Sequence, residues 1–396
     1  MRVRFFFKTK YISLKTIFLI IALLSVCFDS SSQIRFITGY ENSNVDTAVS
    51  VCSYYNNTVC FAPYKNSSNT ETVWFNFGVT GFRRDTIITF LMNYHNQFYP
   101  PNNPVASFNG RDYFNVKARH HNNTNMFYLA PDADTVYVST GYPYSYSRLK
   151  NVVNSLNSNC VKIDSSQTTL QGHRLYYITF TDRSVKERRK RNVWIVARQH
   201  AFESLSSYVA EGMINYLASD EVPVGELLKN YIINIVPMVD IDNVVDGQSG
   251  RMSFPRDFNR DWNNPIHHEI AVLERWIKKH SKNYDMFFDI HATYPGGVNA
   301  DVFSYFDIYG NKGNPELDKF WRRFFFFANY RPKIILDNDN YGGNLSADYY
   351  NAMTYKNLKF ATTIECDWNL NSRGKVWQIS DLFKLGENIL KAIPSE

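Results

Sequence analysis

Residues 192–217, NVWIVARQHAFESLSSYVAEGMINYL, predict a buried strand that delivers two metal-binding side chains to the start of a helix. Residues 193–196 form a short apolar run, and apolar residues recur at helical spacing from Tyr208 onward. His200 and Glu203 lie between these two segments. Because an imidazole and a carboxylate three residues apart on a turn can reach one Zn²⁺ ion, the stretch indicates part of a metal site. A histidine and a glutamate on the solvated surface would show the same pattern. Residues further along the chain must therefore distinguish a metal site from a surface pair.

The composition is that of a folded chain large enough for two domains. The chain has 396 residues, of which 44% are hydrophobic and 20% are charged, so disorder is not expected. The formal net charge is +6, and removing the basic residues that precede Phe28 lowers it to about +1. The net charge therefore gives no support to a nucleic-acid partner.

The first 32 residues have the pattern of a secretory signal peptide. Basic residues precede an apolar run, residues 16–28, and Asp29 and three serines follow it. The apolar run is shorter than the roughly 20 residues that span a bilayer, so an uncleaved anchor is the less favoured interpretation. We therefore expect a secreted or extracytoplasmic protein without stable membrane insertion, whose mature chain begins shortly after Phe28.

Removal of the signal would leave four cysteines, and an even number in an oxidising compartment allows one or two disulfides. Cys52 and Cys60 would form the shortest loop, but spacing does not fix the connectivity. Cys160 and Cys366 are the other two, and none of the four falls in a CxxC pattern. A structural zinc site built on cysteines is therefore not expected.

The pattern of local segments changes near residue 140. Residues 33–140 contain short β-rich segments, such as residues 73–79 (VWFNFGV), separated by clusters of Asn, Pro, Gly and Ser. This pattern is typical of an all-β module. From residue 141 onward, predicted strands alternate with helices, which favours an α/β sheet domain over residues 141–396. The chemistry is expected in the second domain, because the first has no cluster of His, Cys and acidic residues.

Two more apolar strands end in side chains that could complete the metal site. Residues 286–291 (MFFDIH) end in His291, which would be a third protein ligand and leave one zinc position open for water, as in catalytic sites. This histidine could also flank a core strand without binding metal, and only its pairing with His200 favours the ligand. Residues 360–365 (FATTIE) end in Glu365, a carboxylate suited to act as a general base. Strand ends of this kind are where active sites of α/β domains collect.

Residues 257–262 (DFNRDW) place an amide, Asn259, beside a guanidinium, Arg260. The two together can hold a carboxylate by a two-point contact. For any single arginine the commoner role is a salt bridge, here with Asp257 or Asp261.

This ordered set of motifs resembles the zinc carboxypeptidase family, which has the fold of pancreatic carboxypeptidase A. It is most similar to the cytosolic-carboxypeptidase-type branch, which includes tubulin deglutamylases and bacterial relatives. The matching segments are residues 197–208, 211–212, 237–238, 244–247, 257–262, 288–291 and 363–365. That branch carries a β-sandwich joined to the peptidase domain by a tyrosine-rich segment like residues 142–146 (YPYSY). The resemblance implies an α/β fold class: a carboxypeptidase-like domain with a mixed twisted sheet, preceded by an all-β sandwich.

The resemblance also implies a role for each motif residue. It implies zinc ligands His200, Glu203 and His291, a carboxylate clamp of Asn259 and Arg260, and Glu365 as the base. An upstream arginine polarises the scissile carbonyl in the family, and Arg251 is the better match, with Arg256 in reserve. The family's mobile tyrosine is placed only loosely, at Tyr341. Residues 201–202 (AF) replace the Pro-Gly usual in this branch, but the change touches no ligand.

We therefore predict a secreted metallocarboxypeptidase with one zinc ion per chain, which removes C-terminal amino acids from peptides or proteins by means of a zinc-activated water. The signal peptide departs from the cytosolic members and so argues against tubulin as the substrate. One alternative is a peptidase-fold binding protein without catalysis, which a missing ligand or a missing Glu365 would favour. Another is an amidase that acts on γ-glutamyl or cell-wall peptide bonds. The side-chain specificity does not follow from the sequence.

Overall fold

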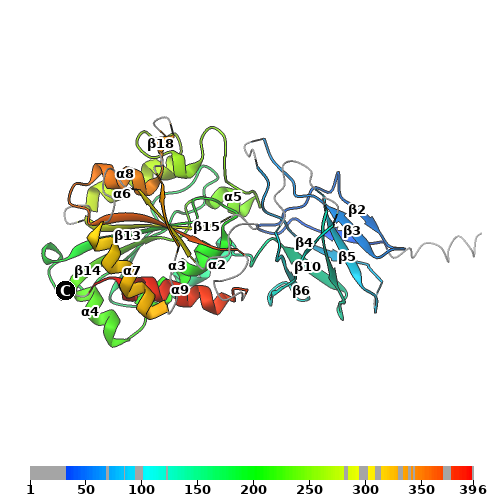
Figure 1. Cartoon of the computed structure of the whole chain (residues 1–396), viewed down its shortest axis with the longest axis horizontal. Helices are drawn as coiled ribbons and strands as arrows, with labels where there is room; N and C mark the ends of the chain where they lie inside the picture. Colours follow the sequence, from blue (N-terminus) through cyan, green and yellow to red (C-terminus); the bar gives the residue numbers. More distant parts are fainter. Residues whose placement is uncertain are drawn as a thin grey trace, which may run out of the picture.

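The computed structural model describes residues 33–67, 71–83, 85–93, 101–121, 124–280, 284–293, 302–307, 314–328, 333–337, 340–341, 344–368 and 376–394. The predicted signal peptide, residues 1–32, lies outside these ranges. Two modules follow one another along the long axis of the molecule, first a strand-rich module and then a larger mixed α/β module (Figure 1). Within the described ranges, no helix combines the length and the apolar character that a bilayer span requires.

The N-terminal module consists of two five-stranded sheets around a shared aromatic core. Phe61 of one sheet and Phe77 of the other have ring centroids 4.8 Å apart, and Phe90 stacks on Phe127 at 4.8 Å. The predicted all-β module is confirmed. The strand order is β1 (Arg35–Ile37), β4 (Asn76–Thr80), β10 (Thr135–Ser139), β6 (Val105–Ser107), β7 (Phe114–Asn115) in one sheet and β2 (Val51–Ser53), β3 (Thr58–Phe61), β5 (Ile88–Met92), β9 (Thr124–Leu129), β8 (Arg119–His121) in the other.

The second module is built on an eight-stranded sheet. Its order is β11 (Val161–Asp164), β12 (Tyr177–Phe180), β14 (Tyr231–Val236), β13 (Arg191–Ala197), β15 (Tyr284–Ala292), β20 (Phe360–Cys366), β16 (Val302–Asp307) and β17 (Lys333–Asp337). The central strands β14, β13, β15 and β20 run parallel. β11 and β12 pair antiparallel with their neighbours, and β16 is antiparallel to β20 but parallel to β17. Residues 193–197 of β13 are buried and apolar, as expected for a parallel strand covered on both faces. The expected mixed sheet is confirmed.

Helices cover both faces of this sheet, with α6 and α8 above it and α3, α7 and α9 below it in Figure 1. A short hairpin of β18 (Asn340–Tyr341) and β19 (Asn344–Leu345) precedes α8. The helices are α2 (Tyr146–Ser155), α3 (Ser204–Leu217), α4 (Val222–Asn230), α5 (Ile241–Val245), α6 (His268–His280), α7 (Pro315–Ala328), α8 (Ala347–Thr354) and α9 (Ile379–Ala392), and the 3-10 turns are η1 (Glu187–Arg189) and η2 (Phe258–Arg260).

Two glycines let α3 and α9 approach closely. A Cβ at Gly212 of α3 would lie 2.3 Å from the carbonyl oxygen of Phe383, and one at Gly386 of α9 would lie 2.2 Å from that of Val209. Because α3 begins directly after the predicted metal-ligand turn, this contact fixes the helix that supports the site.

The tyrosine-rich segment 142–146 lies between the two modules, and its tyrosines are buried. The hydroxyl group of Tyr142 donates a hydrogen bond to the carbonyl oxygen of Trp377 at 3.0 Å. A Cβ at Gly141 would lie 1.8 Å from the Trp368 ring, so the chain enters the second module through a space that only glycine fits. The connection is therefore packed against the α/β module.

The four cysteines of the described chain are free thiols, so the expectation of one or two disulfides is not met. Cys52 pairs with Val59 across β2 and β3, and Cys60 pairs with Val51. Because side chains alternate between the faces of a sheet, this register directs the two thiols to opposite faces. Cys52 and Cys60, the pair closest in sequence, are therefore not placed to form a disulfide.

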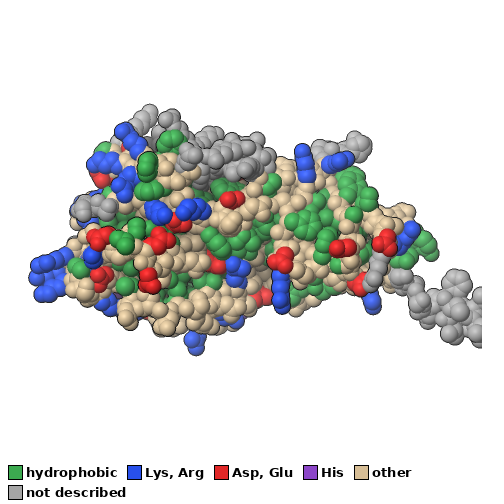
Figure 2. All heavy atoms as spheres, turned by 90° about the horizontal axis from the view of Figure 1, so that it is seen from below, with side chains coloured by type: hydrophobic (Ala, Val, Ile, Leu, Met, Phe, Trp, Pro, Cys, Tyr) green, Lys and Arg blue, Asp and Glu red, His purple; other side chains and the backbone are tan. Residues whose placement is uncertain are grey.

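Acidic and basic side chains lie beside one another among hydrophobic and neutral ones on the face seen from below (Figure 2). This mixture agrees with the small excess of 43 basic over 37 acidic residues in the chain.

We expect Gly386→Ala to lower stability by roughly 1–3 kcal/mol, because the new Cβ forces α9 away from α3. Urea unfolding followed by circular dichroism measures the change. Gly225→Ala in α4 is the matched control, since nothing lies within 4 Å of its Cβ position and alanine is the better helix former. Equal destabilisation by both variants would contradict the close contact.

Candidate active site

Three parallel strands end at one edge of the sheet and carry the predicted site residues. β13 ends at Ala197, which lies opposite Ile290 of β15. The next residue of β15, His291, lies opposite Glu365 of β20. After β13 the chain turns through residues 198–203 into α3. The site is therefore at the carboxyl ends of parallel strands, the usual place in α/β domains.

The three predicted metal ligands meet at one buried place. His200 Nδ1 lies 2.7 Å from Glu203 Oε1, and His291 Nδ1 lies 2.8 Å from Glu203 Oε2. One ligand atom from each residue lies within 4.8 Å of the others, and the three form a group that could hold a metal ion.

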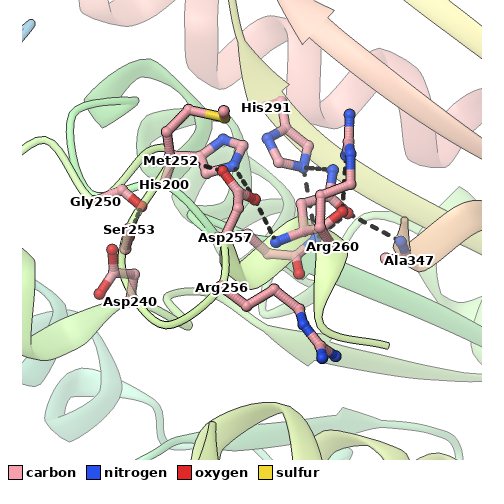
Figure 3. A network of polar contacts seen from close by, with 12 residues as sticks. His200, Asp240, Gly250, Met252, Ser253, Arg256, Asp257, Arg260, His291 and Ala347 are labelled. Atoms are coloured by element: carbon pink, nitrogen blue, oxygen red, sulfur yellow. Dashed lines mark hydrogen bonds and ion pairs between the residues drawn. The ribbon is translucent and has the colours of Figure 1, made fainter. Parts of the chain in front are cut away.

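A buried carboxylate contacts the Nε2 atom of each histidine, on the side of the ring away from Glu203. His200 Nε2 lies 3.0 Å from Asp257 Oδ1, and His291 Nε2 lies 2.9 Å from Asp289 Oδ2. A carboxylate that accepts the Nε2–H leaves the Nδ1 lone pair for a metal, which is the usual outer support of a zinc-bound histidine. Figure 3 shows Asp257 pointing toward His200 and held by the backbone, where the Met252 N–H donates to it at 2.9 Å.

The charges of these residues favour a cation within the cluster. Burial alone would lower the pKa of His200, but the charges of Asp257 and Glu203 outweigh it and raise that pKa to about 9. Asp289 and Glu203 likewise raise the pKa of His291 well above its usual value against the effect of burial. Burial also opposes ionisation of Glu203, but the two imidazoles lower its pKa to about 2. A zinc ion between His200, Glu203 and His291 would supply the positive charge that the carboxylates favour, and the imidazoles would then be neutral ligands. The residues present therefore fit zinc.

Glu365 lies beside this cluster and is not part of the ligand group. Its Oε2 atom is buried and has no hydrogen-bond partner in the described part of the chain. Burial, and after it the charge of Glu203, raises the pKa of Glu365 to about 7, while His291 and Arg251 oppose the rise. A carboxylate with a pKa near neutrality can both accept and donate a proton.

The two candidate arginines of the loop have different surroundings. Arg256 forms an ion pair with the buried Asp261 at 3.1 Å. This is the structural salt bridge that the sequence allowed for an arginine of this loop. Arg251 is half-buried and close enough to Glu365 for its charge to act on that carboxylate. The geometry therefore favours Arg251 over Arg256 as the arginine that faces the reacting groups.

Asn259 and Arg260 lie on η2 beside the histidines. The Asn259 side chain is buried, and its Oδ1 accepts the Ala347 N–H at 2.9 Å and a Gln199 N–H at 3.2 Å. Its Nδ2 lies 3.2 Å from His291 Nε2. The half-buried Arg260 donates from Nη1 to the carbonyl oxygen of Asn259 at 2.7 Å. Asn259 thus belongs to the network that holds the metal ligands, and Arg260 is the more accessible member of the pair.

The backbone of Tyr341 pairs with Asn344 in the β18–β19 hairpin. Its side chain lies outside the described part of the structure, so the expected role of the mobile tyrosine stays a prediction.

Sequence analysis missed the residues that orient the ligands. Asp289 stands two residues before His291 on a strand, and this spacing on one face is the signal that could have found it. Arg198 gave no such signal: it is fully buried, has a φ of 60° and donates to the Ala201 carbonyl oxygen at 2.7 Å and to Ser207 Oγ at 3.1 Å. It therefore links the metal-ligand turn to the first turn of α3.

Residues 146–270 match the sequence model of the zinc carboxypeptidase family, Peptidase_M14. Over this range the chain is similar to zinc carboxypeptidases. The matched range includes His200, Glu203, Arg251 and the Asn259–Arg260 pair, while His291 and Glu365 follow on later strands of the domain.

Curated relatives and solved structures agree with this assignment. The chain is 32% identical over 150 residues to cytosolic carboxypeptidase 2 of Danio rerio, covering 36% of this chain and 21% of the relative. It is 30% identical over 162 residues to cytosolic carboxypeptidase 1 of Homo sapiens, covering 36% of this chain and 13% of the relative. The chain thus spans about a fifth or less of the length of these proteins.

Solved structures share the fold over most of the chain. A metallo-carboxypeptidase from Burkholderia cenocepacia superposes with a TM-score of 0.79 at 22% identity, covering 91% of this chain and 97% of that one. A metallo-carboxypeptidase from Pseudomonas aeruginosa, solved in complex with (2-guanidinoethylmercapto)succinic acid, gives a TM-score of 0.78 at 22% identity, covering 91% and 98%.

The expectation of a secreted or extracytoplasmic protein is wrong. The curated relatives that the chain matches are named cytosolic carboxypeptidases, and this finding contradicts the expectation. A basic segment followed by a short apolar run is a pattern of composition only, and it is weaker than similarity along a folded domain.

We expect Asp289→Asn to weaken zinc binding by roughly 10- to 100-fold, because the amide no longer fixes the His291 ring as a carboxylate does. Competition with a chelator measures the affinity. His291→Ala should bind still more weakly, whereas His173→Ala, which removes a histidine bound to Asp242 outside the site, should keep its zinc. Wild-type affinity in Asp289→Asn would contradict the supporting role.

Proposed function

We propose that the protein is a zinc-dependent metallocarboxypeptidase that hydrolyses the C-terminal peptide bond of peptides or proteins. One observation carries the proposal: two histidine Nδ1 atoms and a carboxylate converge on one buried point, and a second carboxylate, Glu365, lies beside them with an unpartnered Oε2 within the described chain. Ligands for one ion and an adjacent base are the parts that metal-assisted hydrolysis needs.

The zinc would be held by His200, Glu203 and His291, and when bound it supplies a Lewis acid that makes water a nucleophile at neutral pH. Glu365 Oε2 takes the proton of the attacking water. The same atom then gives this proton to the nitrogen of the leaving amino acid, which the raised pKa of Glu365 permits.

The arginines divide the binding of substrate between them. The charge of Arg251 stabilises the negative charge that develops on the carbonyl oxygen, an effect commonly worth about 3–4 kcal/mol. Arg260 binds the terminal carboxylate of the substrate and so limits the enzyme to free C-termini. Asn259 orients Arg260 through its carbonyl oxygen, and its side chain would have to exchange its present partners in order to bind the carboxylate directly.

We expect Glu365→Gln to keep its zinc and to lose activity by roughly 10²- to 10⁴-fold, because the amide has the size of the carboxylate but cannot take a proton. Elemental analysis gives the zinc content. Digestion of a peptide library, read by mass spectrometry as ladders from the C-terminus, gives the activity and the residues released. Wild-type turnover by Glu365→Gln would remove the base from the mechanism, and an inactive wild type that still binds peptides would support a binding protein instead.

We expect Arg260→Ala to lose the preference for free over amidated C-termini, because the substrate carboxylate then has no charged partner. The measurement is kcat/KM for one peptide as the free acid and as the amide. Arg189→Ala is the control, since Arg189 is exposed on η1, ahead of β13 and at the other end of that strand. An unchanged preference in Arg260→Ala would contradict carboxypeptidase action even with the metal site intact.

A further inference from the structure

The turn formed by residues 245–250, the bridging turn, lies between the β-sandwich module and the metal-ligand turn. On its first side, the Asn42 N–H donates to the carbonyl oxygen of Val245 at 3.0 Å, and Asn44 Nδ2 donates to that of Gly247 at 2.6 Å. Gly247 has a φ of 66° and a Cβ there would lie 2.3 Å from the Ser43 carbonyl oxygen. The sandwich therefore presses against this turn so closely that a side chain has no room.

Ser249 joins the two sides of the bridging turn. Its hydroxyl oxygen accepts the backbone N–H groups of Val73 at 2.8 Å and of Trp74 at 3.3 Å, both in the sandwich module. Its carbonyl oxygen accepts the N–H of Phe202 at 2.9 Å, between the two metal ligands of that turn. Ser249 itself is buried. Since buried backbone N–H groups require an acceptor, the serine satisfies three of them at once.

The far side of the bridging turn is equally tight. Gly250 has a φ of 74°, and a Cβ there would lie 2.0 Å from Asp240 Oδ2 and 2.6 Å from the nitrogen of Ala201. The next residue is Arg251, whose charge acts on Glu365. A shift of the turn would therefore be passed to Arg251 and to the segment that carries His200.

We propose that Ser249 is a positioning residue through which the β-sandwich module fixes Arg251 and the metal-ligand turn, so that this module is a working part of the active site. The catalytic consequence rests on the proposed carboxypeptidase function; the positioning itself does not. Displacement of a positioned group by about 1 Å can lower a rate by about 10²-fold.

The test compares three variants of the full chain. Ser249→Ala removes the acceptor, and Ser249→Thr keeps a hydroxyl at the same place. Ser107→Ala is the matched control: this serine is buried in the sandwich, and its Oγ also accepts a backbone N–H, that of Asn109 at 3.2 Å, away from the bridging turn. Hydrogen–deuterium exchange by mass spectrometry reads peptides that cover residues 71–75, 199–205 and 245–252, and peptide hydrolysis gives kcat and KM.

We expect Ser249→Ala to speed exchange in these three segments, to keep its zinc and to lower kcat by roughly 10- to 100-fold with KM unchanged. Ser249→Thr should recover much of the loss, and Ser107→Ala should resemble the wild type. Two results would overturn the proposal: wild-type exchange at residues 199–205 in Ser249→Ala, or faster exchange throughout both modules, which would make Ser249 a residue of general stability. If the wild type cleaves no peptide, the proposed function fails, and the exchange data alone still decide the positioning role.

Discussion

The whole site depends on charged groups taken out of water. His200 and His291 share Glu203 at their centre, and Asp257 and Asp289 stand behind them. Removing several carboxylates from water is costly unless opposite charges accompany them. The imidazoles can supply that charge by taking up protons, or a divalent cation can supply it and leave them neutral. The cluster is therefore organised for a cation before any substrate arrives.

The fold supplies the rigid frame that such a cluster requires. β13 and β15 lie side by side in parallel, and β20 continues the register, so that His291 faces Glu365. Central strands of a sheet are the least mobile part of a domain, because their backbone groups are bonded on both edges. The buried Arg198 holds the turn that follows β13. Its left-handed backbone lets the chain leave the sheet and enter α3. Ligands placed in this way are preorganised, which favours metal binding and catalysis alike.

The sequence predicted the parts of the site that local patterns encode. An apolar run that ends in a histidine or an acid is visible in ten residues, and this is why the sequence could name the three residues that meet in the structure and Glu365 beside them. The pairing of Asp257 with His200 could not be predicted, because the two residues are 57 positions apart in the chain and only folding brings them together. Composition was a poorer guide still, as the mistaken expectation of secretion shows.

The pair Asn259–Arg260 illustrates how one short turn can serve two purposes. The Asn259 side chain lies where three segments meet, since it bonds to Gln199 after β13 and to the start of α8, and its Nδ2 lies 3.2 Å from His291 Nε2 of β15. Its backbone carbonyl oxygen holds Arg260 Nη1 at 2.7 Å. A guanidinium that is already oriented by a neighbouring carbonyl loses less conformational freedom when it binds a carboxylate. The network around the proposed metal ligands therefore also orients Arg260, the proposed partner of the substrate carboxylate, so a change in one would alter the other.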